Sequence, residues 1–280
     1  MNLIIGRNGL IASELIRRGG YTFTTSMINE EGFFLDLYAP ESFDYQQINS
    51  ETKVIFLAAI SSPDKCENDF ENAYSVNVTG TKYFIEKVLE NGGKVLFFSS
   101  DVIYGNTTDP VNEDAPTHPF GEYAKMKDEV EKAFAGKDNF KVFRLSYVLS
   151  QGDKYLQYLQ NCLKESKTAE VFHPFYRKIV FMEDVLDAIE AILQKWDAFP
   201  NQKFNICGNE NVSRKDIADY FNEAVGNNLK YVLIEPDENF WMARPKNIEL
   251  VSLYLEQLLG RKPIKIREAV HNIVKGKKIA

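Results

Sequence analysis

Two short stretches of this 280-residue chain hold hydroxyl, phenol and ammonium groups at spacings that suit proton transfer. Ser99 and Ser100 follow an apolar run at 94–98, so their hydroxyls stand at the carboxyl end of a predicted buried strand. Tyr123 and Lys127 lie four residues apart, which on a helix places the phenol and the ammonium on one face, one turn apart. Together these groups could protonate or deprotonate an oxygen atom.

A glycine turn near the start of the chain predicts a dinucleotide site. The segment Gly6-Arg7-Asn8-Gly9-Leu10-Ile11-Ala12 follows an apolar run at 2–5 and precedes a helical pattern. Gly6 permits the tight turn, and Gly9 lets the backbone approach a pyrophosphate on the N-terminus of the helix. The spacing differs from the common GxGxxG pattern, so a plain strand, turn and helix without a ligand stays open.

The end of the next strand bears on which cofactor fits. We expect a strand at 21–25, and no Asp or Glu stands at its end, where an acid would bind the adenosine ribose. Thr24, Thr25 and Ser26 stand there instead, and Arg7 lies in the glycine turn. Hydroxyls and a guanidinium suit a 2′-phosphate, which predicts NADP(H), or acceptance of both NADP(H) and NAD(H). The alternative is that Arg7 is a solvated turn residue.

Further strand ends add candidates for the same site. Strands expected at 32–37 and 53–57 end in Asp36-Leu37 and lead into Ala58-Ala59, and a long helix expected at 72–90 carries Asn77. Asp36 could accept a hydrogen bond from the adenine amino group or cap the following turn, whereas the alanines leave room for a ring. Because Asn is a poor helix former, Asn77 either orients backbone near the site or is simply exposed.

Strands and helices alternate through the first half of the chain, which is typical of an α/β fold built on a doubly wound parallel sheet of the Rossmann type. We expect a dinucleotide-binding domain at 1–150, to which a segment at about 180–200 returns, and a smaller α/β substrate-binding lobe at 151–280. Ligands of such sheets bind outside the carboxyl ends of the strands, where the candidate residues above all lie.

The composition disfavours several kinds of partner. The net charge is −7 with both signs scattered along the chain, which argues against a surface for nucleic acid or for anionic membranes. Three cysteines and three histidines are dispersed, so neither a disulfide frame nor a metal site is predicted. We expect no signal peptide, and the longest apolar run, 54–60, is too short to cross a bilayer. The sequence therefore predicts a cytoplasmic protein and allows a homodimer.

Six motifs, in this order and in these predicted contexts, resemble those of the extended short-chain dehydrogenase/reductases of the NAD-dependent epimerase/dehydratase superfamily. They are Gly6-x-x-Gly9-x-x-Ala12, Asp36-Leu37, Leu57-Ala58-Ala59, Asn77-Val-Thr-Gly80-Thr81, Ser99-Ser100 through Tyr104-Gly105, and Tyr123-x-x-x-Lys127. Within that family the chain is similar to dTDP-4-dehydrorhamnose reductases and related nucleotide-sugar enzymes. That similarity rests on Asp64-x-Cys66-Glu67, Ser100-Asp101-Val-Ile-Tyr104 and Ala243-Arg244-Pro245 through Leu250. The resemblance covers nearly the whole chain and is looser after residue 150.

The resemblance implies a role for each group of the two opening stretches. Tyr123 would donate a proton to a substrate carbonyl as a hydride arrives from the nicotinamide, and Lys127 would bind the nicotinamide ribose. The Lys127 ammonium and the oxidised nicotinamide would bring the phenol's pKa down from about 10 toward working pH. Ser100 would hold the carbonyl oxygen toward Tyr123, while Ser99 competes for that role and is also a candidate cofactor contact.

The substrate implied by the resemblance is a nucleotide-linked sugar, with Ser100, Asp101, Arg177 and Arg244 as its candidate contacts. A diphosphate needs cations, and the guanidinium fork pairs well with phosphate oxygens. Ordinary solvated surface charge is the alternative for each arginine.

Three functions follow, in order of preference. The first is NADP(H)-dependent reduction of a keto group on a nucleotide-linked sugar. The second is a nucleotide-sugar epimerase or dehydratase with tightly bound NAD, although Val102 stands where dehydratases of the family have the Glu of an Asp-Glu pair. The third, from another class, is a catalytically silent nucleotide-binding subunit, which the intact Ser100, Tyr123 and Lys127 disfavour.

Overall fold

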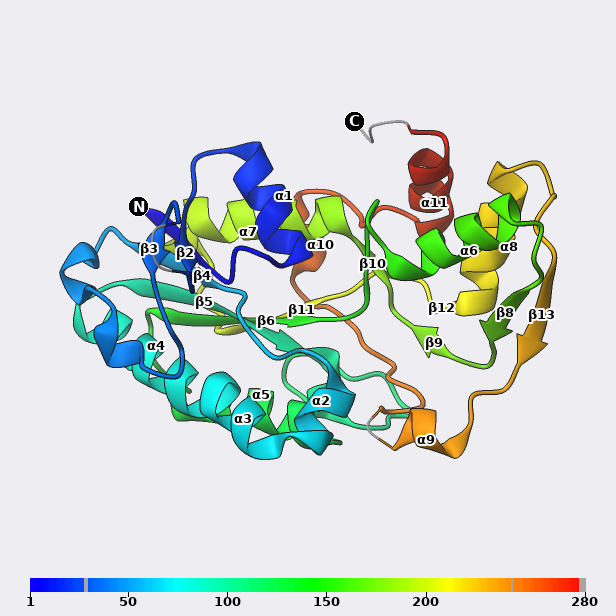
Figure 1. The fold of residues 1–280 in the computed structure, drawn as a ribbon. Helices are drawn as coiled ribbons and strands as arrows, with labels where there is room; N and C mark the ends of the chain where they lie inside the picture. Colours follow the sequence, from blue (N-terminus) through cyan, green and yellow to red (C-terminus); the bar gives the residue numbers. More distant parts are fainter. Residues whose placement is uncertain (28–29, 243, 277–280) are drawn as a thin grey trace.

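A computed structural model describes residues 1–27, 30–242 and 244–276 of the chain. Its centre is a seven-stranded sheet in the order β11-β6-β5-β4-β1-β2-β3, in which every neighbouring pair is parallel (Figure 1). The strands are β1 (Asn2–Ile5), β2 (Thr22–Thr25), β3 (Phe33–Phe34), β4 (Lys53–Phe56), β5 (Lys94–Ser100), β6 (Phe140–Leu145) and β11 (Lys203–Ile206). The chain runs from β1 to one edge and resumes at β4 toward the other, so the predicted doubly wound sheet is confirmed.

Helices cover both faces of the sheet because the strands carry apolar side chains on both sides. Ile4 and Ile55 face one helical layer, and Leu3 and Val54 face the other. Figure 1 shows the sheet between these two layers. The first layer holds α1 (Leu10–Arg18), α7 (Met182–Gln194) and α10 (Leu255–Leu259), and the second holds α4 (Thr81–Glu90) and α5 (Glu122–Ala133).

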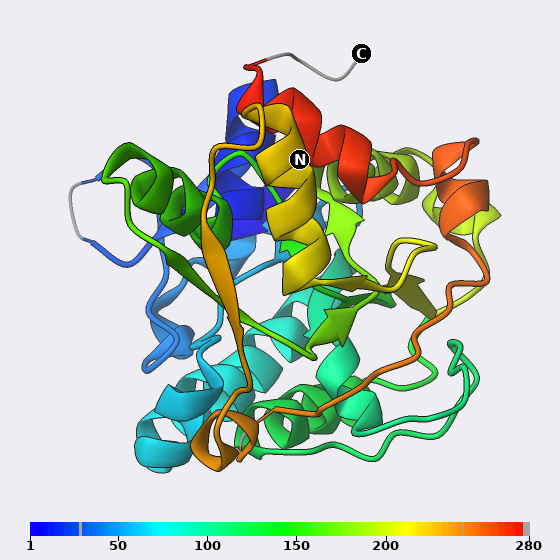
Figure 2. The same cartoon turned by 90° about the vertical axis from the view of Figure 1, so that its right-hand side faces the viewer.

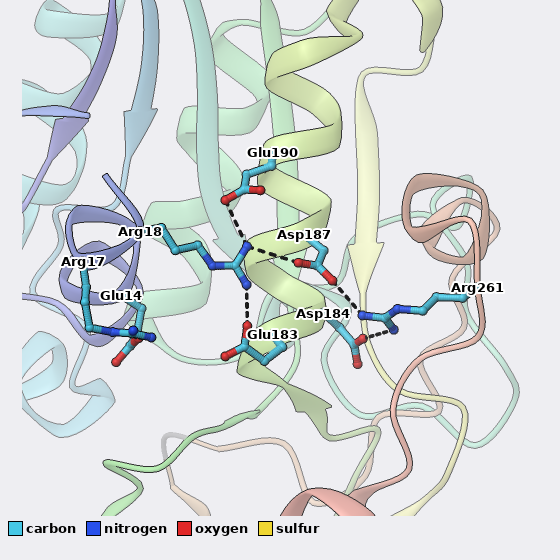
Figure 3. A network of polar contacts seen from close by, with 8 residues as sticks. All are labelled: Glu14, Arg17, Arg18, Glu183, Asp184, Asp187, Glu190 and Arg261. Carbon is cyan, nitrogen blue, oxygen red and sulfur yellow. Dashed lines mark hydrogen bonds and ion pairs between the residues drawn. The ribbon is translucent and has the colours of Figure 1, made fainter. Parts of the chain in front are cut away.

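An ion-pair network fixes α1 against α7 (Figure 3). The contacts run from Arg18 to Glu183, Asp187 and Glu190, and from Arg261 to Asp184 and Asp187. The carboxylates come from successive turns of α7, and Asp184 is fully buried. The network therefore fixes the helix that begins directly after the glycine turn.

The second half of the chain builds a smaller lobe beside the carboxyl ends of β5 and β6. Its core packs α6 (Lys154–Lys164), α8 (Arg214–Ala224) and α11 (Ile266–Val274) with the parallel strands β8 (Ala169–Phe172) and β13 (Tyr231–Ile234). Two short pairs complete it, β7 (Val148–Leu149) with β10 (Val180–Phe181) and β9 (Tyr176–Arg177) with β12 (Val212–Ser213). Figure 2 shows α9 (Glu238–Trp241) following β13, near the helices of the first half.

Three parts of the fold differ from expectation. The helix expected at 72–90 is divided, since α3 (Phe70–Tyr74) passes into a π-helical turn, Ser75–Gly80, before α4. No periodic pattern predicts strands at 171–181, yet β9 and β10 lie there. The segment that returns to the sheet extends beyond 180–200, because β11 pairs with β6. The boundary at residue 150 stays a prediction.

None of the helices in the described ranges combines the length and the apolar character needed to span a bilayer. Ala243, the first residue of the late motif, lies outside them.

Candidate active site

A groove of about 550 Å³ lies at the carboxyl ends of β1, β2 and β4. This is the point where the strand order reverses, as expected for a dinucleotide site in such a sheet. The predicted cofactor residues that line it are Gly6, Arg7, Asn8, Gly9, Thr25, Ser26, Asp36, Leu37, Ala58 and Ala59. The predicted residues that do not line it are Leu10, Ile11, Asn77, Ser99, Tyr123 and Lys127.

The glycine turn is shaped for close approach. Gly6 has φ +94°, and a Cβ added there would lie 2.7 Å from the backbone of Ala58, so no other residue fits without a shift. Leu10 and Ile11 open α1, and amides in a first helical turn have no acceptor within the helix. Their backbone, and not the exposed Leu10 side chain, therefore offers donors to an anion. These residues fit the pyrophosphate of a dinucleotide.

The opposite wall, Asp36-Leu37, packs on the π-helical turn. A Cβ at Gly80 would collide with the carbonyl oxygen of Leu37, so the glycine allows this contact. Oδ1 of Asp36 accepts a hydrogen bond from the Tyr38 amide at 2.9 Å. Asp36 therefore caps the following turn through Oδ1, and its contact with adenine stays a prediction.

Asn77 does not line the groove but holds in place a residue that does. It is buried in the π-helical turn, where its Oδ1 accepts from the Ile60 amide at 2.8 Å and its Nδ2 donates to the Ile60 carbonyl at 3.0 Å. Ile60 lines the groove. The structure thus excludes an exposed Asn77 and shows it bracing the loop after β4.

An acidic side chain reaches the end of β2 from the loop that follows it. Glu30 comes from the loop after β2, and its carboxylate accepts a hydrogen bond from Thr25 Oγ1 at 3.0 Å and lies 3.7 Å from the Arg7 guanidinium. Arg7 also stacks over Phe23, with its guanidinium carbon 4.4 Å from the ring centroid. The end of β2 therefore carries one cation and one anion, and the anion comes from a loop residue that the sequence analysis did not consider as a ribose contact.

A second cavity, of about 270 Å³, lies at the ends of β5 and β6. Ile60 and Ser61 line the groove, and Pro63, two residues later at the start of a helix (Pro63–Asn68), lines the cavity, so the two spaces adjoin. All four predicted substrate contacts line the cavity: Ser100, Asp101, Arg177 and Arg244.

Of the two serines that end β5, only Ser100 lines this cavity. Its hydroxyl donates to Oδ1 of Asp101 at 3.2 Å and caps the short 3₁₀ helix Asp101–Tyr104. Ser99 points to the other face of the strand, is buried, and has a hydroxyl without a hydrogen bond to any described residue. The alternation of the strand favours Ser100 as the substrate contact.

Two buried polar atoms at the cavity lack a well-formed hydrogen bond. By hydrogen-bond geometry, Oδ2 of Asp101 and Oγ of Ser146 have no partner within the described ranges, and both residues line the cavity. The Ser146 hydroxyl nevertheless lies near enough to the Asp101 carboxyl to lower the pKa of that carboxyl. Burial raises the pKa of the Asp101 carboxyl, and the nearby Arg177 guanidinium opposes that rise. Buried polar atoms without partners are rare, so a hydroxyl-bearing ligand would complete them.

Tyr123 and Lys127 lie on α5 with the predicted spacing. The Lys127 ammonium is 5.9 Å from the centroid of the Tyr123 ring. It is buried and donates to the Phe98 carbonyl at 2.8 Å. Tyr123 packs against the cluster that holds Cys66 and lines neither cavity.

Burial dominates the pKa of Tyr123 in the protein without a nicotinamide. Burial raises it above the ordinary value, and the neighbouring Cys66 and Asp101 add to the rise. Burial also lowers the pKa of Lys127 to about 8, against the pull of Glu131. A single ammonium that bonds to a backbone carbonyl does not offset desolvation of the phenol.

A buried ion pair joins α5 to β6. Arg144 of β6 donates to Glu131 of α5 through Nη2 at 2.6 Å and Nε at 3.1 Å. Its Nη1 donates to the Tyr104 hydroxyl at 2.6 Å, and Tyr104 ends the 3₁₀ helix that Ser100 caps. The pair therefore joins the helix of Tyr123 and Lys127 to the strand end of Ser100.

Replacement of Glu131 by glutamine is expected to lower the free energy of unfolding by about 3–5 kcal/mol. The reason is that Arg144, only 3% exposed, would keep its charge without a counter-ion. Urea denaturation measures the loss. The control is Glu14→Gln, which breaks a more exposed pair with Arg17 on α1 and should change stability by less than about 1 kcal/mol. Equal effects of the two variants would contradict this account.

The two predicted substrate arginines already have partners. Arg177 is buried and donates to the carbonyls of Tyr176 at 2.7 Å and Pro245 at 2.6 Å. Arg244 binds the carboxylate of Asp64 through two hydrogen bonds, at 2.9 and 2.7 Å. Solvated surface charge, the alternative considered for each, is therefore wrong for Arg177.

Sequence reasoning missed three residues of this region: Glu30, Ser146 and Arg214. Arg214 and Ser146 line the substrate cavity, and Glu30 faces Arg7. Ser146 follows β6 by one residue, so the rule that ligands bind at strand ends was a usable signal. The other two had none, because loops and a helix start bring them there.

A doubly wound sheet with a glycine turn at its switch point, a serine at the end of β5 and a Tyr-Lys pair on α5 defines the extended short-chain dehydrogenase/reductases, a class of NAD(P)-dependent oxidoreductases. The chain belongs to the family described as RmlD substrate binding domain, whose family model matches residues 1–279. The predicted resemblance to nucleotide-sugar reductases of this class is thereby confirmed.

Several proteins are similar to the chain. The spore coat polysaccharide biosynthesis protein SpsK of Bacillus subtilis is 26% identical over 69% of this chain and 68% of that protein. The dTDP-4-dehydrorhamnose reductase of Aggregatibacter actinomycetemcomitans is 25% identical over 79% of each. Methionine adenosyltransferase 2 subunit beta of Bos taurus is 25% identical over 73% of this chain and 64% of that protein. The structure of a dTDP-4-dehydrorhamnose reductase from Clostridium acetobutylicum shares the fold, with a TM-score of 0.82, 20% identity and 98% coverage of both chains.

Proposed function

We propose that the protein reduces a keto group on a nucleotide-linked sugar with NAD(P)H, and that Tyr123 is the proton donor. The observation that carries the proposal is the substrate cavity, in which Ser100 and Asp101 stand next to a groove that fits a dinucleotide. The relatives named dTDP-4-dehydrorhamnose reductase support a substrate of this kind. A cytoplasmic location and a homodimer remain predictions.

Each residue of the proposed site has one role in the reduction of the keto group. Ser100 donates a hydrogen bond to the keto oxygen and orients it. Tyr123, whose raised pKa keeps the phenol protonated at neutral pH, gives its proton to that oxygen, so the carbonyl becomes an alcohol. A reduced nicotinamide, when bound, supplies the hydride to the carbonyl carbon. Lys127 binds the nicotinamide ribose and stabilises the tyrosinate left behind.

The test follows the absorbance of the reduced nicotinamide during incubation with dTDP-linked and UDP-linked keto-sugars. We expect at least one of them to be reduced, with one cofactor oxidised for each alcohol formed. An epimerase would instead be purified with NAD bound and would interconvert sugars without net oxidation of cofactor. Cofactor binding without turnover of any sugar would favour the silent nucleotide-binding subunit.

The cofactor preference depends on Arg7 and Glu30, and we propose that both NADPH and NADH are accepted. A 2′-phosphate would pair with Arg7, whereas free ribose hydroxyls would donate to Glu30. Glu30→Gln should shift the ratio of kcat/KM values toward NADPH by about fivefold, and Arg7→Met should shift it toward NADH by a similar factor. The two variants control for each other, since shifts in the same direction would contradict the assignment.

A further inference from the structure

The motif Asp64-x-Cys66-Glu67 lies on α2 (Pro63–Asn68), a helix that begins at the wall of the substrate cavity. α2 packs against α5, the helix of Tyr123 (Figure 1). Cys66 is buried, whereas Asp64 and Glu67 are exposed on the surface of α2. Each of the three side chains contacts a different element, so α2 lies at a junction of the fold.

Two of these contacts fix α2 itself. The Cys66 thiol donates to the Ile60 carbonyl at 3.3 Å, and Ile60 lines the cofactor groove. The Asp64 carboxylate accepts two hydrogen bonds from Arg244, at 2.9 and 2.7 Å. Because one contact lies within the first half of the chain and the other is made with the second half, α2 has a defined place between the two.

The third contact reaches the start of α5. Oε1 of Glu67 accepts a hydrogen bond at 2.8 Å from the backbone amide of Glu122, the first residue of α5. Gly121, the residue before it, has φ +83°, a conformation that favours glycine, and a glycine has no side chain with which to cap the helix. Glu67 therefore supplies, from another helix, the carboxylate that a helix N-terminus prefers.

Tyr123 depends on this end of α5 more than the later residues of the helix do. It is the second residue of α5, and helix ends open more readily than helix interiors. The later turns have anchors of their own, since Lys127 donates to a backbone carbonyl of β5 and Glu131 pairs with the buried Arg144. Loss of the Glu67 contact should therefore loosen the turn of Tyr123 and leave the rest of α5 in place.

We propose that Glu67 is a positioning residue for Tyr123, on which it acts through the first turn of α5. Its effect on turnover rests on the proposed function, in which Tyr123 gives its proton to the keto oxygen. A proton donor must lie within hydrogen-bond distance of its acceptor, so a loosened turn lowers the rate of that step. Glu67 lines neither the groove nor the substrate cavity, and it should therefore affect the rate and not the binding of either ligand.

Glu67→Ala is expected to lower kcat for keto-sugar reduction by about five- to thirtyfold, the factor by which loss of a helix cap shifts an equilibrium. KM for the sugar and the affinity for NADPH should stay within about twofold. Glu67→Gln keeps an oxygen that accepts from the Glu122 amide, so its kcat should lie within about threefold of the wild type. Asp44→Ala is the matched control, because exposed Asp44 accepts from the Gln46 amide and lines neither cavity, and it should leave kcat unchanged.

A double-mutant cycle separates positioning from a general loss of stability. If Glu67 acts through the phenol, Glu67→Ala should change kcat by less than about twofold in the Tyr123→Phe background. Thermal unfolding checks that every variant is folded at the temperature of the assay. An unchanged kcat in Glu67→Ala, or a loss that is equally large without the phenol, would overturn the assignment.

Amide hydrogen exchange, followed by mass spectrometry, gives a readout that needs no turnover. The amides at 122–125 should exchange about fivefold faster in Glu67→Ala and at the wild-type rate in Glu67→Gln and Asp44→Ala. If the wild type reduces no keto-sugar, the proposed function fails, and exchange alone decides whether Glu67 holds the turn of Tyr123. Faster exchange in Glu67→Ala would then uphold the contact, and unchanged exchange would refute it.

Discussion

Replacement of Tyr123 by phenylalanine is expected to lower kcat for keto-sugar reduction by about 10²–10⁴-fold. The variant loses only the hydroxyl that gives up the proton, so the alkoxide formed by hydride addition would have to take its proton from elsewhere. The affinity for NADPH should stay within about twofold, because Tyr123 does not line the cofactor groove. Single-turnover kinetics and cofactor titration measure the two quantities.

Tyr74→Phe is the matched control. Tyr74 packs against the same cluster as Tyr123, but its hydroxyl donates to the carboxylate of Glu129. This variant should retain nearly full turnover. If Tyr123→Phe were as active as Tyr74→Phe, another group would have to deliver the proton.

The features that could be predicted from sequence are those set by local pattern. The apolar runs at 2–5, 53–57 and 94–98 became β1, β4 and β5, since buried parallel strands need apolar side chains on both faces. The glycine turn was predictable because Gly6 meets a steric requirement that only glycine satisfies. Parallel strands end at one edge, so placing Ser100 and Ala58 at strand ends also predicted that they lie near one site.

Features set by long-range contact could not be predicted. Glu30 reaches Arg7 from a loop, and Arg244 meets Asp64, which is 180 positions away in the sequence. The short strands β9 and β10 have two residues each, too few for a periodic pattern. The raised pKa of Tyr123 depends on burial, which the spacing of Tyr123 and Lys127 does not specify. A protonated phenol is the form that a reductase needs before the hydride moves.

Lys127→Met is expected to abolish turnover and at the same time to stabilise the protein. Burial lowers the pKa of Lys127 from 10.5 to about 8, so the folded chain disfavours the charged form. At neutral pH burial of the charge destabilises the folded wild type by about 3 kcal/mol, and the methionine variant avoids this cost. The variant also loses the hydrogen bond to the Phe98 carbonyl, which lowers its stability by about 1 kcal/mol. Methionine has a similar length and fits a buried site. The free energy of unfolding should therefore rise by about 1–3 kcal/mol.

The sign of the pH dependence provides a second check. Between about pH 8 and 10.5 the unfolded chain binds the Lys127 proton and the folded chain does not, so this group makes the wild type more stable as pH rises through that window. The methionine variant lacks this contribution, and its advantage over the wild type should shrink across the same range. A variant that is less stable than the wild type at pH 7 would mean that Lys127 supports the fold. A more stable and inactive one would mean that the buried ammonium is kept for chemistry at the expense of stability.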